Sequence, residues 1–274
     1  MSSRIRFSIR TLAILGTLVA LLSVNAGPAL ADSGNGQPTV VLVHGAWAGP
    51  SSWDTVVRRL NEEGFRTATP TLGLTSLSED AAIVTATLNQ IRGKKILVAH
   101  SYGGAVISIA SAARTDVAAL VYSAAFVPDK GDSLLSLGAG FTPSGVIAHL
   151  LWSGAPFAPG SLASIDPVYF PQFFAQDLPA SQAAALNAAQ RPIAFNPVFF
   201  TPAGPVGWHQ IPCWYQVSGA DRMIDPAEER FMGGRACATV VEYPTSHVGG
   251  ITLFAGQFAS LIERAVEATI ENQQ

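Results

Sequence analysis

The chain has 274 residues and a formal net charge of −3 at pH 7, and only 13% of its side chains are charged while 49% are hydrophobic. This composition lacks the basic footprint that nucleic-acid binding requires, so we expect no nucleic-acid partner. No cysteine and histidine residues have the spacing of a zinc site and no glycine-rich phosphate loop opens a helix, so we predict neither a zinc site nor a phosphate-binding loop.

The first segment, residues 1–31, is predicted to be a signal peptide. It begins with scattered arginines, continues with an apolar stretch at 12–24, and ends in the small residues "ALA" that suit cleavage. The apolar stretch is shorter than the roughly 20 residues of a membrane span, although an uncleaved anchor is the alternative. We therefore expect a secreted or periplasmic protein without stable membrane association after cleavage, and one mature domain at 32–274.

After the signal peptide, the chain alternates segments typical of strands and of helices, which favours an α/β fold with a mostly parallel sheet flanked by helices. Runs of β-branched and small aliphatic residues predict strands at 39–44, 65–70, 95–99, 117–127, 213–219 and 237–244. The segments between them predict helices at 51–64, 76–93, 101–113, 226–235 and 251–270. Ser78 is the predicted cap of the second helix, because serine is a preferred N-cap residue.

Residues 128–210 interrupt this alternation. They are rich in proline and aromatic residues and poor in charge, so we predict a small helical cap inserted over the sheet, with its clearest helix at 179–190. A loop-rich flank of the core is the alternative. The aromatic content predicts an apolar pocket, and its candidate lining residues, each of which could equally belong to the core, are Trp47, Phe126, Phe141, Trp152, Phe170 and Trp208.

Three polar residues follow separate predicted strands. Ser101 lies in "LVAHSYGGA", which is similar to the G-x-S-x-G turn that exposes a nucleophilic serine, although a helix N-cap is the alternative. Asp221 follows the strand at 213–219, and His247 follows the last strand. Because the carboxyl ends of parallel strands meet at one edge of the sheet, we expect these three side chains to lie close together.

These residue types suit nucleophilic catalysis. A serine hydroxyl is a weak nucleophile, so an imidazole must take its proton, and a carboxylate must orient that imidazole. We predict Ser101 as nucleophile and His247 as base. Asp221 is favoured over Asp225 as the acid, because Asp225 precedes Pro226 at a helix start, where an acidic cap is ordinary.

The developing oxyanion needs backbone N–H donors. The segment after the first strand supplies Ala46, where Gly45 allows the backbone to approach closely. Tyr102 supplies the N–H that follows the nucleophile. We therefore predict the backbone N–H groups of Ala46 and Tyr102 as the oxyanion hole.

The two cysteines of the chain, Cys213 and Cys237, begin the last two predicted strands, at the edge opposite the polar residues. If these strands are neighbours about 4.8 Å apart, their first residues are within reach of a disulfide. Export places them in an oxidising compartment, where such bonds persist. We expect a disulfide, and two buried free thiols are the alternative.

The stretches "VVLVHGAWAGPSSWDTVV", "VAHSYGGAVI", "WYQVSGADRMIDP" and "TSHVGG" resemble the α/β-hydrolase superfamily. They are similar to its branch of plant methyl-ester esterases, hydroxynitrile lyases and small bacterial esterases, over about residues 39–268. The resemblance implies a cofactor-free hydrolase with a helical cap, and it carries over Ser101 as nucleophile, His247 as base and Asp221 as its partner. It also implies oxyanion donors at Ala46 and Tyr102.

Two departures separate this chain from the hydroxynitrile lyases that it resembles. Those enzymes place threonine or asparagine at the position of Gly45, and one lineage has lysine at the position of Val248. Both favour a serine hydrolase that cleaves a small or apolar carboxylic ester, a small-molecule partner, through an acyl-enzyme on Ser101. The alternatives are a cofactor-free C–C lyase and a non-catalytic binding protein on the same scaffold.

Overall fold

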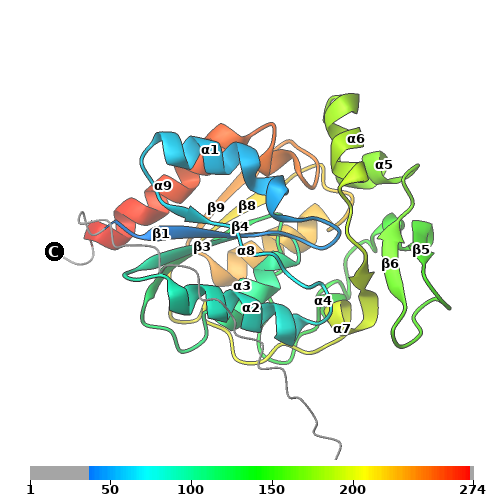
Figure 1. Cartoon of the computed structure of the whole chain (residues 1–274), viewed down its shortest axis with the longest axis horizontal. Helices are drawn as coiled ribbons and strands as arrows, with labels where there is room; N and C mark the ends of the chain where they lie inside the picture. The colour runs from blue at the N-terminus through cyan, green and yellow to red at the C-terminus, as the bar shows by residue number, and fades with distance from the viewer. Residues whose placement is uncertain (1–36, 272–274) are drawn as a thin grey trace, which may run out of the picture.

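The structure is a computed structural model that describes residues 37–271. Its central sheet has six parallel strands in the order β2-β1-β3-β4-β8-β9 (Figure 1). The strands are β1 (Thr39–Val43), β2 (Thr67–Ala68), β3 (Lys95–His100), β4 (Val117–Ser123), β8 (Cys213–Ser218) and β9 (Thr239–Tyr243). The predicted α/β class and parallel sheet are confirmed, whereas the predicted signal peptide lies outside the described residues.

Helices cover both faces of this sheet (Figure 1). One face carries α1 (Asp54–Glu62) and α9 (Ala255–Glu271), and the other carries α2 (Leu77–Gln90), α3 (Gly103–Ala110) and α8 (Pro226–Ala236). Two short 3-10 helices, η1 (Pro50–Trp53) and η3 (Gly249–Ile251), lie in the connections. Because both faces are covered, every residue of β1 and β3 is buried, and this burial explains their continuous apolar sequences. Across residues 37–271, no helix has the length and hydropathy to cross a membrane.

The start of α2 differs from the prediction. Ser78 lies inside the first turn, and the N-cap residue is Ser76. Ser76 has an extended backbone, which brings its hydroxyl within 3.2 Å of the Glu79 N–H that it accepts. The predicted cap at Ser78 is therefore wrong by two residues, because only the residue that still has an extended backbone can reach the free N–H groups of the first turn.

The segment between β4 and β8 gathers beyond the carboxyl ends of the central strands (Figure 1). It contains the helices α4 (Leu134–Leu137), η2 (Gly145–His149), α5 (Phe170–Phe174), α6 (Ala180–Ala188) and α7 (Phe195–Phe199). It also contains an antiparallel sheet of β5 (Leu150–Trp152), β6 (Leu162–Ile165) and β7 (Ile193–Ala194), which the sequence analysis did not predict. These strands have at most four residues, too few for a period-two pattern to be visible.

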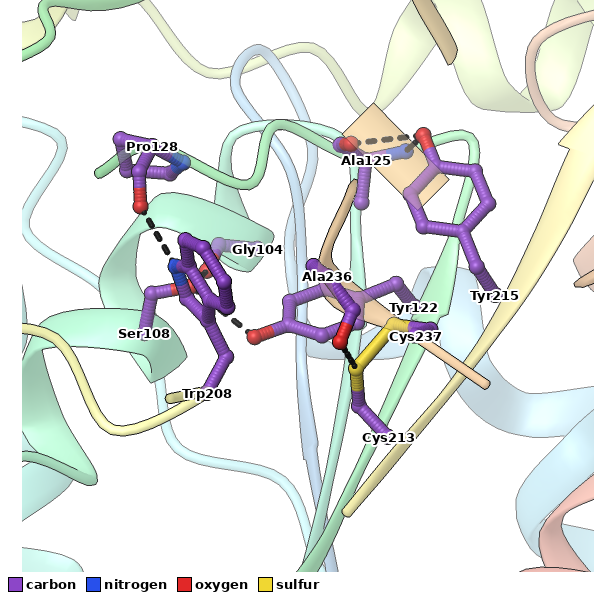
Figure 2. Close-up of a disulfide and its surroundings, with 10 residues drawn as sticks. All are labelled: Gly104, Ser108, Tyr122, Ala125, Pro128, Trp208, Cys213, Tyr215, Ala236 and Cys237. Atoms are coloured by element: carbon purple, nitrogen blue, oxygen red, sulfur yellow. Dashed lines mark hydrogen bonds between the residues drawn. A yellow bond between two sulfur atoms is a disulfide. The ribbon is translucent and has the colours of Figure 1, made fainter. Parts of the chain in front are cut away.

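A disulfide joins Cys213 to Cys237, whose Cα atoms are 4.8 Å apart (Figure 2). Cys213 is the first residue of β8, as predicted. Cys237 does not begin β9 but follows α8 as its C-cap, two residues before the strand. The bond therefore ties the end of α8 to the amino-terminal end of the neighbouring strand, at the edge of the sheet opposite Ser101.

Loss of this disulfide should lower stability without lowering activity. The bond spans a sequence separation of 24 residues, which in the chain-entropy model corresponds to about 3 kcal/mol. We expect the Cys213→Ser/Cys237→Ser double variant to melt roughly 6–12 °C below the wild type in calorimetry. Its turnover at room temperature should match the wild type. Titration of two free thiols in the unfolded, non-reduced wild type would contradict the prediction.

Candidate active site

Ser101 lies on a sharp turn between β3 and α3. Its backbone φ is 54°, a left-handed conformation that residues other than glycine rarely adopt. The turn is so tight that only glycine fits at positions 103 and 104. A Cβ on Gly103 would lie 2.5 Å from the Val43 carbonyl oxygen, and one on Gly104 would lie 2.4 Å from the Phe126 carbonyl oxygen. The N-cap of α3 is the next residue after Ser101, and no side chain caps this helix. The alternative role of Ser101 as an N-cap is therefore contradicted.

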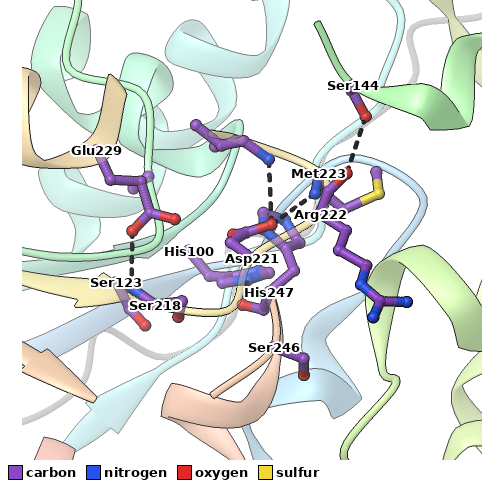
Figure 3. A network of polar contacts seen from close by, with 12 residues as sticks. His100, Ser123, Ser144, Ser218, Asp221, Arg222, Met223, Glu229, Ser246 and His247 are labelled. Atoms are coloured by element: carbon purple, nitrogen blue, oxygen red, sulfur yellow. Dashed lines mark hydrogen bonds and ion pairs between the residues drawn. The ribbon is translucent and has the colours of Figure 1, made fainter. Parts of the chain in front are cut away.

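His247 and Asp221 form a buried pair (Figure 3). The Nδ1 of His247 lies 2.6 Å from Oδ2 of Asp221, and the two side chains are 1% and 0% exposed. The other carboxylate oxygen, Oδ1, accepts the backbone N–H groups of Met223 at 2.6 Å and Ile224 at 3.1 Å. A carboxylate can only accept hydrogen bonds, so the proton of this bond is on Nδ1 of His247. The other ring nitrogen, Nε2, has no hydrogen-bond partner within the described chain.

His100 connects this pair to the serine turn. Its Nε2 donates to the backbone carbonyl oxygen of His247 at 2.9 Å, and the two imidazole rings lie 4.6 Å apart. Complete burial lowers the pKa of His100 well below its ordinary value, so its ring is neutral. Because His100 directly precedes Ser101, this bond ties the backbone of His247 to the end of β3, where the serine turn begins.

Asp225, the alternative acid, has other partners. Its Oδ1 accepts the Ala227 N–H at 2.9 Å and caps α8, as the sequence predicted. Its Oδ2 accepts the Thr142 N–H at 2.8 Å. These backbone hydrogen bonds lower the pKa of Asp225, so it is ionised in its capping role, while Asp221 is the carboxylate that contacts His247.

The loop after β1 packs closely against Ser101. A Cβ on Gly45 would lie 2.8 Å from the Cβ of Ser101, so only glycine permits this approach. His44 fixes this loop: its Nδ1 donates to the Gly45 carbonyl at 2.9 Å, and its Nε2 accepts the Leu72 N–H at 3.1 Å. Burial lowers the pKa of His44 to about 4 and keeps it neutral. The predicted oxyanion donor Ala46 follows directly in this loop.

The sequence model of the alpha/beta hydrolase family matches residues 40–260. The chain belongs to the alpha/beta hydrolase family. Its predicted fold and family resemblance are thereby confirmed, and the fold also agrees with solved structures of other hydrolases. Polyneuridine aldehyde esterase superposes with a TM-score of 0.73 at 17% identity, covering 84% of this chain and 99% of that one. A pyrethroid hydrolase from Sphingobium faniae JZ-2 gives 0.70 at 23% identity, covering 85% and 99%.

A further relative is the carbendazim-hydrolysing esterase of Nocardioides sp. (strain SG-4G). It is 37% identical to this alpha/beta hydrolase over 110 residues, which are 35% of this chain and 46% of that protein. The aligned part therefore spans less than half of that relative.

Two further carboxylates, the buried Asp80 and the exposed Asp177, bond to residues next to the site of this hydrolase, and the sequence analysis missed both. Asp80 accepts the Tyr102 hydroxyl at 2.7 Å, which anchors the residue after the serine to α2. Asp177 accepts the Ser246 N–H at 2.7 Å, next to His247. Asp80 was visible only as part of an acidic first turn, and Asp177 carried no local signal. Their roles depend on contacts between distant segments.

An apolar cavity of about 40 Å³ opens at Ser101. Two of the predicted pocket residues, Trp47 and Phe126, line it. The remaining lining residues, which the sequence analysis did not single out, are Ser144, Val146, Ile147, Phe195, Phe199, Met223 and Ile224. Because most of them come from the inserted segment, their convergence depends on how that segment folds over the sheet.

The other four predicted pocket residues, Phe141, Trp152, Phe170 and Trp208, lie outside the cavity at Ser101. Phe141 packs against a phenylalanine of α8, and Trp152 packs among the aromatic rings of the inserted segment. Phe170 lines a separate cavity beside His100. Trp208 donates its Nε1 hydrogen to a backbone carbonyl near the disulfide (Figure 2). These four side chains therefore fill the core and the inserted segment.

Two consecutive glutamates of α8 are buried near Asp221. Glu229 is inaccessible to solvent, and its Oε2 accepts the Ser218 N–H at 2.9 Å (Figure 3). Burial, reinforced by the charge of Asp221, raises the pKa of Glu229 well above its ordinary value. Glu228 is only 5% exposed, and burial together with the charges of Asp225 and Asp221 raises its pKa to about 7. The fold therefore raises the pKa of both glutamates.

Glu228 should make stability pH-dependent. Because its pKa is raised to about 7 from an unfolded value of 4.5, its contribution is complete below that unfolded value. The contribution is lost as the pH rises through 7, by up to about 3 kcal/mol. We expect Glu228→Gln to flatten this decline, which urea unfolding at about pH 5 and about pH 8 measures. Glu62→Gln, on the exposed side of α1, is the control, and equal pH slopes in all three proteins would contradict the prediction.

Proposed function

We propose that this alpha/beta hydrolase cleaves carboxylic esters through an acyl-enzyme on Ser101. The observation that carries the proposal is the 2.6 Å bond between His247 Nδ1 and Asp221 Oδ2. It leaves Nε2 of His247 without a hydrogen-bond partner in the described chain, and His247 is itself bonded to the residue that precedes Ser101. The names of similar proteins, a carbendazim-hydrolysing esterase and a polyneuridine aldehyde esterase among them, agree with ester hydrolysis.

In the proposed reaction, the Oγ of Ser101 attacks the ester carbonyl carbon while Nε2 of His247 takes the hydroxyl proton. Asp221 holds the ring and stabilises the imidazolium. The alcohol then leaves with the proton from His247, which generates the acyl-enzyme. A water molecule, deprotonated by His247, attacks the acyl carbon, and the acid leaves as Ser101 recovers its proton.

The backbone N–H groups of Ala46 and Tyr102 are proposed to bind the oxyanion of both tetrahedral intermediates. Tyr102 precedes α3, where the first N–H groups of a helix lack intrahelical acceptors. The close contact of Gly45 with Ser101 supports hydrolysis over the lyase alternative, because a side chain at position 45 would overlap the Cβ of Ser101.

We further propose that residues 1–31 direct export and are removed. The disulfide between Cys213 and Cys237 agrees with folding in an oxidising compartment. Mass spectrometry of protein recovered outside the cytoplasm, with an amino terminus at Asp32, tests this part of the proposal.

Esters of p-nitrophenol with acyl chains of increasing size test the reaction itself. The apolar lining of the cavity at Ser101 supports a preference for apolar acyl or alcohol groups. A mandelonitrile assay runs in parallel, and cyanide release without ester hydrolysis would favour the lyase. Binding of esters without turnover would favour a binding protein.

A further inference from the structure

The cavity at Ser101 continues into a wider cavity of about 190 Å³ that reaches α8. The two cavities share the lining residues Phe126, Ser144, Ile147, Phe199 and Met223. The two cavities therefore adjoin, and we name them together the α8 cleft. A substrate bound with its reacting carbonyl at Ser101 has room to extend along the α8 cleft to the helix.

Glu228 lies at the far end of the α8 cleft. Its side chain is 5% exposed, yet its Oε1 has no hydrogen-bond partner in residues 37–271. A Cβ on Gly138 would lie 3.6 Å from Oε2, so the chain after α4 packs closely over the carboxyl group. A buried carboxyl without a partner is costly, because it has lost its water without a replacement hydrogen bond.

The charges around the α8 cleft favour a positively charged ligand. Asp225 also lines the wider cavity, and the described lining residues include no lysine, arginine or histidine. Clefts lined by one sign of charge concentrate the opposite charge. Phe126 and Phe199 also line the path, and aromatic rings attract cations through the negative charge of their faces.

We propose that Glu228 anchors a subsite for a protonated amine on an otherwise apolar ester, with an ammonium N–H donating to its carboxylate. This subsite assignment rests on the proposed ester hydrolysis at Ser101, and it deepens that function by naming the substrate class. The apolar part of the substrate occupies the aromatic stretch between Ser101 and Glu228. The ammonium group supplies a hydrogen-bond donor to the carboxyl group, which has none within the described chain.

Three probes of similar length test the subsite: phenylbutylamine, phenylbutanol and phenylbutyrate. Each is titrated calorimetrically into the wild type, and each is assayed as an inhibitor of p-nitrophenyl acetate hydrolysis. We expect the amine to bind at least about tenfold more tightly than the alcohol, and the carboxylate to bind most weakly. Inhibition by the amine should be competitive. Glu228→Gln should reduce the advantage of the amine to within about threefold, while the control Glu62→Gln retains it.

An amine that binds no better than the alcohol in the wild type would overturn the subsite. An advantage that persists in Glu228→Gln, or non-competitive inhibition by the amine, would overturn it as well. The two proposals fail separately. If no ester is hydrolysed, the calorimetric comparison still measures the subsite, and if all three probes bind alike, hydrolysis at Ser101 stands unaffected.

Discussion

Replacing Ser101 with alanine should abolish nearly all ester turnover. The variant loses the nucleophile and retains only the oxyanion donors and substrate binding, so we expect kcat to fall by about 10⁴- to 10⁶-fold. Turnover of p-nitrophenyl acetate by purified protein measures the loss. The melting temperature should stay close to that of the wild type, because the turn is held by backbone hydrogen bonds, such as Ser101 N–H to the Ser123 carbonyl, which alanine keeps.

Ser78→Ala is the matched control for this experiment. Ser78 is an exposed serine in the first turn of α2, and it does not cap the helix. Its replacement should leave turnover at the wild-type level. If Ser101→Ala instead retained most of the wild-type turnover, the acyl-enzyme mechanism would be excluded.

Replacing Asp221 with asparagine should be nearly as damaging. The amide cannot stabilise an imidazolium at His247, and its NH₂ group favours the wrong ring tautomer, so we expect kcat to fall by about 10³- to 10⁴-fold. KM should change little, because Asp221 does not line the cavity at Ser101. Steady-state kinetics on one p-nitrophenyl ester separates the two constants.

Asp225→Asn provides the comparison, since Asp225 is four positions further along and caps α8. Asparagine is also a good N-cap residue, but its single side-chain oxygen cannot also accept the Thr142 N–H, so we expect a small loss of stability and turnover close to that of the wild type. The reverse result, a severe loss in Asp225→Asn with a mild effect in Asp221→Asn, would assign the acid to Asp225.

The central sheet was predictable because its strands are buried on both faces. Such strands must be continuously apolar, and β1 and β3 are visible in the sequence for that reason. The same topology made the meeting of Asp221 and His247 predictable, since both follow parallel neighbours, β8 and β9. Here the chain order alone was sufficient, because parallel strands bring their ends to a common edge.

The inserted segment was much less predictable. Its strands β5, β6 and β7 are too short for a periodic pattern, and their pairing depends on residues far apart in the chain. The lining of the α8 cleft was missed for a related reason. Glu228 looks like an ordinary charge in the first turn of a helix, and only the packing of the chain after α4 buries it.

Trp47 belongs both to the cavity wall and to the attachment of the inserted segment. Its ring lines the cavity at Ser101, and its Nε1 donates to the Ala163 carbonyl oxygen on β6 at 3.0 Å. Its own carbonyl oxygen accepts the Arg191 N–H at 3.2 Å. Trp47 directly follows Ala46, so the inserted segment is fastened to the loop that carries a proposed oxyanion donor. Exchange of this segment between relatives, in evolution or in engineering, therefore has to preserve the acceptor at position 163. Without it, a segment that changes substrate specificity would also shift the loop that carries the proposed oxyanion donor.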